Sequence, residues 1–241
     1  MTDPITGLSS MATRKVLADL TEAYHRSTGG RVAFRSMGGV DAARLIRSGA
    51  AIDLVVLASG VMERLESEGH LLPGSRTTFV RSGIAVAVPV GAPHPDLCDE
   101  AALRRAMLEG GTLCYSTGPS GDHLRQLWER WGLADEMARR AIQAPPGTSV
   151  ASLLARGEAS LGFQQLSEMI GVEGVQIVGP LPAEAQSITV FEAGISILSA
   201  DRASCDAFIG FATGPDADDI ITRNGLSVQD REDRNAASTS I

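Results

Sequence analysis

The chain has 241 residues, enough for one large domain or two lobes of ordinary size. Hydrophobic residues make up 44% and charged residues 21%, which is the balance of a globular protein. The net charge of −8 argues against nucleic acid or an anionic membrane surface as a general partner. A small anionic ligand is not excluded, because a pocket has its own local field. Since Lys15 is the only lysine, Schiff-base chemistry and a Walker A loop have little support.

The three cysteines and four histidines are scattered along the chain and include no C-x-x-C pair. A structural zinc site normally needs ligands that cluster in the sequence. We therefore expect no metal, and no motif indicates a cofactor. Cys114 lies in an apolar stretch, so we interpret it as a buried small residue rather than as a nucleophile paired with a histidine.

The first residues, Met1 to Pro4, contain neither the basic segment nor the apolar core of a secretory signal. We expect a cytoplasmic protein on this ground, or a periplasmic one if a leader was removed from the chain. Cysteines that are not paired in disulfides are typical of a reducing compartment such as the cytoplasm. No apolar run reaches the roughly 18 residues that span a bilayer, so no membrane insertion is expected.

Short β-like runs alternate with amphipathic stretches, which is typical of an α/β protein with largely parallel sheets. The first third of the chain predicts three strands, each followed by a helix. The strands are expected at 4–8, 31–35 and 53–57, and the helices at 11–27, 40–47 and 60–68.

The same alternation continues after a turn at 72–74. Strands are expected at 84–89, 112–115, 159–163, 176–178, 188–191 and 193–198. Helices are expected at 100–109, 122–131, 149–156, 166–169, 203–212 and 215–224. Residues 227–241 are charged and rich in small residues, which predicts a disordered tail.

Small hydroxyl residues and glycines stand just after a strand and just before a helix at three places. Free N–H groups at a helix start bind anions without a lysine, and small residues let the ligand approach them. Ordinary caps and turns are the alternative interpretation. Because all three places follow predicted parallel strands, where α/β ligand crevices form, we expect them to bind a small anion. The residues are Ser9, Ser10, Ser36, Gly38, Gly39, Ser116, Ser120 and Gly121.

Three segments carry a resemblance to a known family. They are Ser9-Ser10 with the helix that ends at 24–29, the stretch 49–54 with Glu68-Gly69 beyond it, and the turn Arg156-Gly157-Glu158-Ala159. They resemble the molybdate-binding-protein-like branch of the type II periplasmic-binding-protein family, over about residues 5–226. A narrower set is similar to a subgroup that includes aconitate isomerase. This set is 81–84, 91–96, 164–168, 179–182, 189–191 and 193–194.

The resemblance implies two α/β lobes, each a mixed, mainly parallel sheet flanked by helices, with a ligand cleft between them. Lobe one would comprise residues 1–80 plus 194–226, and lobe two residues 82–190. The hinges would be Arg81-Ser82 and Phe191-Glu192.

The resemblance also implies roles for residues beside the hinges. Arg81, next to Ser82, would hold a carboxylate with both arms of its guanidinium; a surface salt bridge is the alternative. Gln164 and Gln165 follow a strand where the family contacts its ligand, and one of them should face the cleft. Phe191 stands where the family's oxyanion binders often use a tyrosine, which weakens a specific molybdate interpretation.

Two functions follow from the resemblance. The first is an isomerase that shifts a double bond in a small di- or tricarboxylate by allylic proton transfer, with Ser10, Tyr115 and Glu192 as candidate catalytic residues. The second is a non-catalytic solute-binding protein for a small anion, with an ABC permease as partner if it is exported. A cytoplasmic ligand sensor is a third class, but no signalling or DNA-binding module accompanies the lobes. The fold alone does not choose among them.

Overall fold

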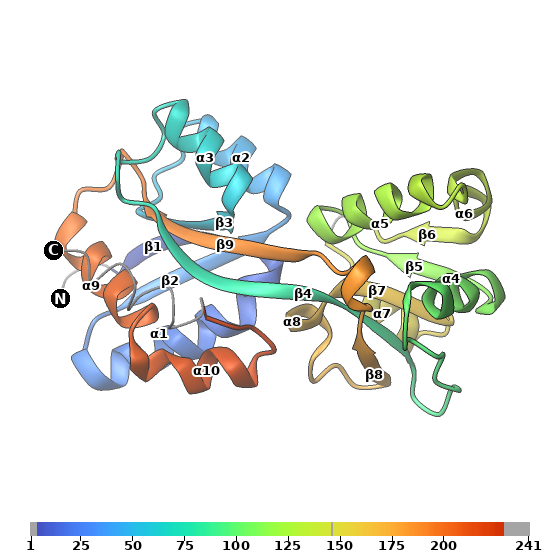
Figure 1. The fold of residues 1–241 in the computed structure, drawn as a ribbon. Coiled ribbons are helices and arrows are strands. Elements are labelled where there is room, and N and C mark those ends of the chain that lie inside the picture. Colours follow the sequence, from blue (N-terminus) through green and yellow to red (C-terminus); the bar gives the residue numbers. More distant parts are fainter. Residues whose placement is uncertain (1–3, 146, 229–241) are drawn as a thin grey trace, which may run out of the picture. The chain divides into compact units, whose positions relative to one another are not determined.

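The computed structural model describes residues 4–145 and 147–228. The chain forms two compact units, residues 1–81 with 190–241 and residues 82–189. Two strands, β4 (Thr77–Pro89) and β9 (Ile188–Ile195), carry the chain from one unit to the other (Figure 1). The crossing points are therefore Arg81/Ser82 on β4 and Thr189/Val190 on β9. Residues 229–241 of the expected tail lie outside the described residues.

The first unit is built on a sheet in the order β2-β1-β3-β9. β1 (Ile5–Ser10) pairs in parallel with β2 (Val32–Met37) and β3 (Leu54–Ala58), whereas β9 is antiparallel to β3. Helices follow these strands. They are α1 (Arg14–Thr28), α2 (Gly39–Arg47), α3 (Ser59–Ser67), α9 (Arg202–Ala212) and α10 (Asp218–Arg223), with the short 3-10 turns η1 (Met11–Thr13) and η3 (Pro215–Ala217).

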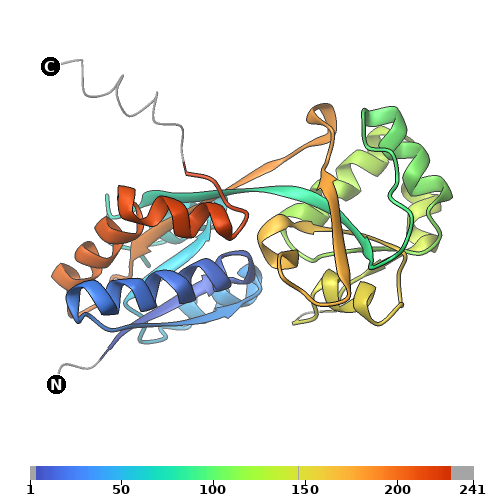
Figure 2. The same cartoon turned by 90° about the horizontal axis from the view of Figure 1, so that it is seen from below.

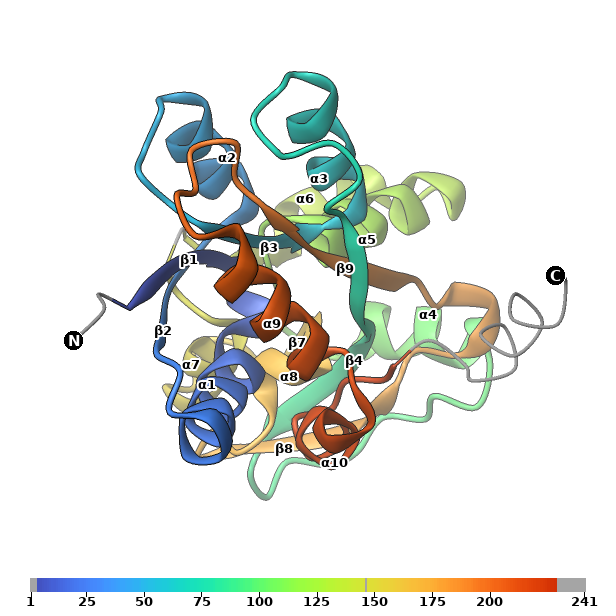
Figure 3. The ribbon, with the colours of Figure 1, turned by 90° about the vertical axis from the view of Figure 1, so that its left-hand side faces the viewer.

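Alternation along β3 gives this sheet two apolar faces. Leu54 and Val56 belong to a core shared with α1, α9 and α10, which lie together in Figure 2. Val55 and Leu57 belong to a separate core with α2 and α3. Figure 3 shows these two helix layers on opposite sides of the sheet. Both faces being covered explains why this strand is apolar at nearly every position.

The second unit has a mixed sheet in which β5 (Leu113–Tyr115) pairs in parallel with β6 (Ala141–Gln143) and β7 (Leu161–Gln165). β4 runs antiparallel to both β7 and β8 (Val175–Pro180). One face packs on α4 (Glu100–Glu109), α5 (Pro119–Arg130) and α6 (Ala134–Arg140), the other on α7 (Val150–Ala155) and α8 (Leu166–Met169). A 3-10 turn, η2 (Ala183–Ala185), precedes β9.

The architecture confirms an α/β protein with mixed sheets, and most of the expected elements are present. Three details differ. β4 begins at Thr77 rather than at residue 84, the strands expected at 188–191 and 193–198 form the single strand β9, and α6 and β6 were not predicted. In the described part of the chain, no helix combines the length and apolar character needed to cross a membrane.

Candidate functional site

The parallel strands β1, β2 and β3 end at one edge of the first sheet, where η1, α2 and α3 begin. Ser10 ends β1 and caps η1, and its hydroxyl accepts a hydrogen bond from Ala12 N (3.4 Å). The amides that start these helices point toward this edge with the positive end of each helix dipole. The edge therefore favours a negatively charged ligand.

Ser9 and Ser36 face each other across this edge. They are register partners on β1 and β2, and their hydroxyl oxygens lie 2.8 Å apart. Ser9 is fully buried and Ser36 is partly buried. The Ser9 hydroxyl also donates to the carbonyl oxygen of Ser10 (3.3 Å), so in this arrangement Ser36 supplies the proton between the two hydroxyls. The structure thus brings these two predicted residues together.

Gly38 and Gly39 begin α2 without any side-chain cap. A Cβ atom built on Gly39 would meet no atom within 4 Å, so the space in front of the helix start is open. Gly38 has an ordinary backbone conformation (φ −58°), which any residue adopts. What these glycines provide is uncovered backbone amides rather than an unusual turn.

Arg81 is the last residue of the first unit and lies within β4. Its Nε atom is buried and has no hydrogen-bond partner among the described residues. A guanidinium N–H left unpaired in the interior is costly, and an anionic acceptor would remove that cost. The next residue, Ser82, is almost fully buried in the second unit.

The second unit has a similar edge after β5. The hydroxyls of Ser116 and Ser120 are both buried and lie 2.6 Å apart. A Cβ atom on Gly121 would lie 1.9 Å from the carbonyl oxygen of Ser116, so only glycine lets the first turn of α5 approach this loop. Gly118, just before α5, has φ +92°, which also favours glycine. The three predicted residues therefore form one compact loop-to-helix junction.

Gln164 and Gln165 belong to β7 itself and face opposite sides of the sheet. Gln164 accepts a hydrogen bond from Val150 N (2.9 Å) and donates to Glu168 Oε2 (2.7 Å). The side-chain amide of Gln165 lies 2.8 Å from Thr189 Oγ1. In the amide orientation that gives both its oxygen and its nitrogen a partner, the oxygen accepts from Thr189 Oγ1 and the nitrogen donates to Ser82 Oγ (2.8 Å). Gln165 thus links β4 and β9 just where both strands enter the second unit.

The remaining catalytic candidates, Tyr115 and Glu192, are each engaged by another side chain. The Tyr115 ring packs edge-on against Trp128, with ring centroids 5.0 Å apart. Glu192 is bound at both oxygens by Arg76, through Nε (2.8 Å) and Nη2 (3.4 Å). These bonds to Glu192 raise the pKa of Arg76, which also pairs with Glu66 (2.9 Å). Catalytic roles for Ser10, Tyr115 and Glu192 stay predictions.

Phe191 is buried in the core of the first unit, opposite Ala58 on β3. Its ring thus has a packing role in this core, whatever it does toward a ligand. Cys114 is also buried, and desolvation raises the pKa of its thiol to about 12. It is therefore a neutral thiol at neutral pH.

Replacing Arg76 with alanine is expected to lower the free energy of unfolding by roughly 1–3 kcal/mol, because Glu192, only 13% exposed, would lose its cation. The double variant Arg76→Ala/Glu192→Gln should recover part of this loss, since the unpaired charge is gone. Urea unfolding of both variants measures the difference. A cost below about 0.5 kcal/mol for Arg76→Ala would show that water, rather than Arg76, compensates Glu192.

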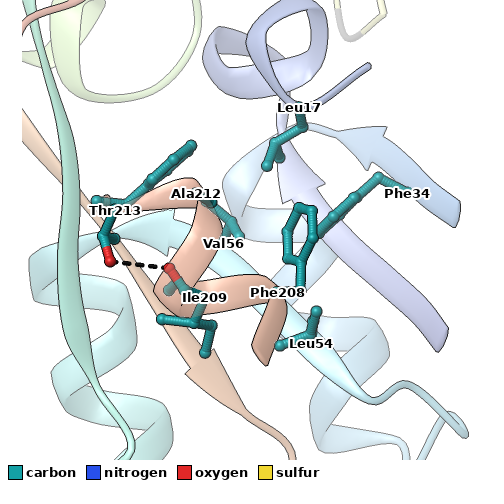
Figure 4. A pocket seen from close by; sticks show the side chains of 10 residues that line it. Leu17, Phe34, Leu54, Val56, Phe208, Ile209, Ala212 and Thr213 are labelled. Atoms are coloured by element: carbon teal, nitrogen blue, oxygen red, sulfur yellow. Dashed lines mark hydrogen bonds between the residues drawn. The ribbon is translucent and has the colours of Figure 1, made fainter. Parts of the chain in front are cut away.

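A small apolar cavity of about 10 Å³ lies elsewhere in the first unit (Figure 4). It has room for about one water molecule, but its lining offers almost no polar partner. It is a packing gap between the sheet, α1 and α9 rather than a ligand site. The residues around it include Leu17, Phe34, Leu54, Val56, Phe208, Ile209, Ala212 and Thr213.

Sequence reasoning did not single out Ser149, which caps α7 by accepting a hydrogen bond from Ser152 N (3.1 Å). The strand that leads to it, β6, has only three residues and gives no periodic signal. The usable signal was Ser149 itself, a cap residue directly before an apolar run. Thr189 was missed as well, because the hinge was placed two residues later.

Comparisons with known proteins agree with this arrangement. The family model for bacterial extracellular solute-binding proteins matches residues 5–227. An aconitate isomerase from a Pseudomonas species is 32% identical over 233 residues, covering 92% of this chain and 88% of that protein.

Solved structures with the same fold include oxyanion-binding proteins. The periplasmic molybdate-binding protein of Azotobacter vinelandii is 25% identical, with a TM-score of 0.78 over 94% of this chain and 100% of that one. The tungstate-binding protein TupA of Desulfovibrio alaskensis G20 has a TM-score of 0.64 at 14% identity, over 91% and 94% of the two chains. The chain belongs to the bacterial extracellular solute-binding proteins and has the type II periplasmic-binding-protein fold that its motifs indicate.

Proposed function

We propose that this protein binds a small di- or tricarboxylate and isomerises it by allylic proton transfer. The observation that carries the proposal is Arg81, whose buried Nε atom has no hydrogen-bond partner within residues 4–145 and 147–228. A planar guanidinium matches a carboxylate with two parallel hydrogen bonds, so an anionic ligand of this class would supply the missing acceptor. The relationship to an aconitate isomerase at 32% identity supports the same ligand class.

The hydroxyls and helix start at the strand edge of the first unit suit another carboxylate of such a ligand. Ser9 and Ser36 lie there beside the open start of α2. A tricarboxylate carries its charges on several separate carbons, whereas a tetrahedral oxyanion concentrates its charge on one centre. Donors that are distributed over several elements therefore match a tricarboxylate better than a tetrahedral oxyanion.

In the proposed reaction a base removes a proton from the methylene carbon next to the double bond. The electron pair shifts through the allylic system, and a proton is added to the far alkene carbon, so the atoms and charges of substrate and product balance. Donors at the carboxylates stabilise the negative charge of the dienolate in between. Ser10, Tyr115 and Glu192 are the candidates for proton transfer; Glu192 would have to leave its ion pair with Arg76 to act.

The alternative is a solute-binding protein without catalysis that delivers a small anion to an ABC permease. The molybdate-binding relative, at 25% identity and a TM-score of 0.78, favours this function. It requires the protein to be exported, whereas we propose a cytoplasmic location for the isomerase. An oxyanion would also have to bind without a phenol at position 191, which is Phe191.

Titration calorimetry with cis-aconitate, trans-aconitate, the saturated analogue tricarballylate, and molybdate tests the proposal. We expect the tricarboxylates to bind at least about tenfold more tightly than molybdate, a difference of about 1.4 kcal/mol. Tricarballylate keeps the three carboxylates without the double bond, so it separates binding from turnover. Tight binding of molybdate with no heat from any carboxylate would overturn the proposal in favour of the receptor.

A further inference from the structure

After α10 the chain returns to β4. Gly225 makes the turn after α10 with φ +71°, and Leu226 is buried in the core of the first unit. Val228 packs against the same core. We call Asn224–Ser227 the C-terminal strap. Asn224 and Leu226 are buried, which shows that the strap is part of the packed unit, whereas Ser227 is exposed.

The start of the strap is tied to α1. Asn224, only 1% exposed, donates to Asp19 Oδ2 (2.9 Å) and to Ile220 O (2.8 Å), and it accepts from Lys15 Nζ (2.9 Å). Burial alone would raise the pKa of Asp19, but the hydrogen bond from Asn224 and the charges of Lys15 and Arg223 together lower it. A satisfied, buried amide of this kind fixes the segment that follows it.

The end of the strap is bonded to Arg81. The Arg81 amide donates to Ser227 O (2.8 Å), and the Ser227 amide donates to Arg81 O (3.0 Å). This is a closed antiparallel bridge, in which both backbone polar groups of Arg81 are engaged by one residue. Arg81 is also the last residue before the chain enters the second unit, and its buried Nε atom has no partner in the part of the chain that the structure describes.

We infer that the C-terminal strap positions Arg81 for the anion, with Ser227 acting through its backbone as a positioning residue. This inference rests on the proposed function, because it requires Arg81 to bind the ligand. Fixing the backbone of one residue costs conformational entropy. If the strap already orders the Arg81 backbone in the free protein, ligand binding does not have to order it, and the affinity is higher.

The variant Ser227→Pro tests the strap because proline lacks the N–H that donates to Arg81, and Ser227→Ala is the matched control because it keeps that N–H. We expect Ser227→Pro to weaken binding of trans-aconitate, or of molybdate where that binds more tightly, about tenfold. Ser227→Ala should bind as the wild type does. Asn224→Ala, which releases the anchor without altering the bridge, should give a smaller loss of about threefold. If Ser227→Pro does not fold, Asn224→Ala tests the strap in its place.

Two further measurements separate positioning from general destabilisation. Val16→Ala, in the same core but outside the strap, should lower the melting temperature without changing the dissociation constant. In an Arg81→Ala background, Ser227→Pro should cause no further loss of affinity, because the positioned group is gone. Hydrogen exchange at the Arg81 amide should accelerate in Ser227→Pro and stay slow in Ser227→Ala.

The outcomes distinguish failure of the inference from failure of the proposed function. If Arg81→Ala abolishes binding while Ser227→Pro and Asn224→Ala leave it intact, the strap has no positioning role and the inference is wrong. An equal loss from Ser227→Pro with and without Arg81 would also overturn it, since the effect would not pass through Arg81. If Arg81→Ala itself binds normally, the role of Arg81 in the proposed function fails, and the inference fails with it.

Discussion

Replacing Arg81 with alanine is expected to weaken carboxylate binding at least about a hundredfold, or about 2.7 kcal/mol. Two charge-assisted hydrogen bonds to one carboxylate are lost together, and each such bond contributes about 1.5–3 kcal/mol. Stability should change little or even rise, because the buried, unpaired Nε atom is removed. Titration calorimetry with trans-aconitate measures the first effect and urea unfolding the second.

Arg81→Lys is the control for the shape of the group. Lysine keeps the positive charge but presents a single ammonium in place of a planar fork, so we expect an intermediate affinity. If Arg81→Lys binds as tightly as the wild type, Arg81 supplies only charge. If Arg81→Ala also binds as tightly, the ligand does not contact this residue.

Gly121→Ala is expected to destabilise the second unit by roughly 2–4 kcal/mol and to disturb the loop that carries Ser116. The new Cβ atom would lie 1.9 Å from the Ser116 carbonyl oxygen and 3.0 Å from its carbonyl carbon. Both are backbone atoms, so no side-chain rotation relieves the overlap. The loop or the first turn of α5 must move, and the bond between Ser116 and Ser120 should weaken with it.

Gly210→Ala is the matched control, since a Cβ atom there would meet nothing within 4 Å and the residue lies inside α9. It should be neutral or stabilising by up to about 1 kcal/mol, because alanine favours helix. Urea unfolding without ligand compares the two variants. A cost below about 1 kcal/mol for Gly121→Ala would mean that this junction adapts easily and that the close approach is not required.

The sequence predicts the parts of this fold that depend on local periodicity. The buried strand around Val55 and Val56 and the amphipathic α5 are long or apolar enough to be recognised without tertiary information. The sequence also predicts that Ser9 and Ser36 follow parallel strands, whereas the contact between their hydroxyls is known only from the structure. Each of these features is set by residues close together in the chain, or by a general rule of sheet topology.

The remaining features depend on contacts between distant residues. β6 is too short to show a period, and its position is set by pairing with β5. The sequence makes Glu192 a candidate catalytic residue at the hinge, but its ion pair with Arg76 cannot be predicted, because Arg76 lies 116 residues earlier. Ser227 was assigned to a disordered tail for the same reason, since its partner Arg81 is far away in the sequence. The composition of a segment shows that it is polar, but it does not show which distant residue the segment binds.

Proton NMR of trans-aconitate incubated with the purified protein in D₂O tests the proposed chemistry most directly. We expect the signals of cis-aconitate to grow until equilibrium is reached, and exchange of substrate protons with solvent deuterium where the base equilibrates with water. The Arg81→Ala variant at the same concentration should leave the spectrum unchanged over that time. If the wild-type spectrum also stays unchanged while calorimetry shows tight binding of molybdate, the protein is an anion receptor and the isomerase assignment is wrong.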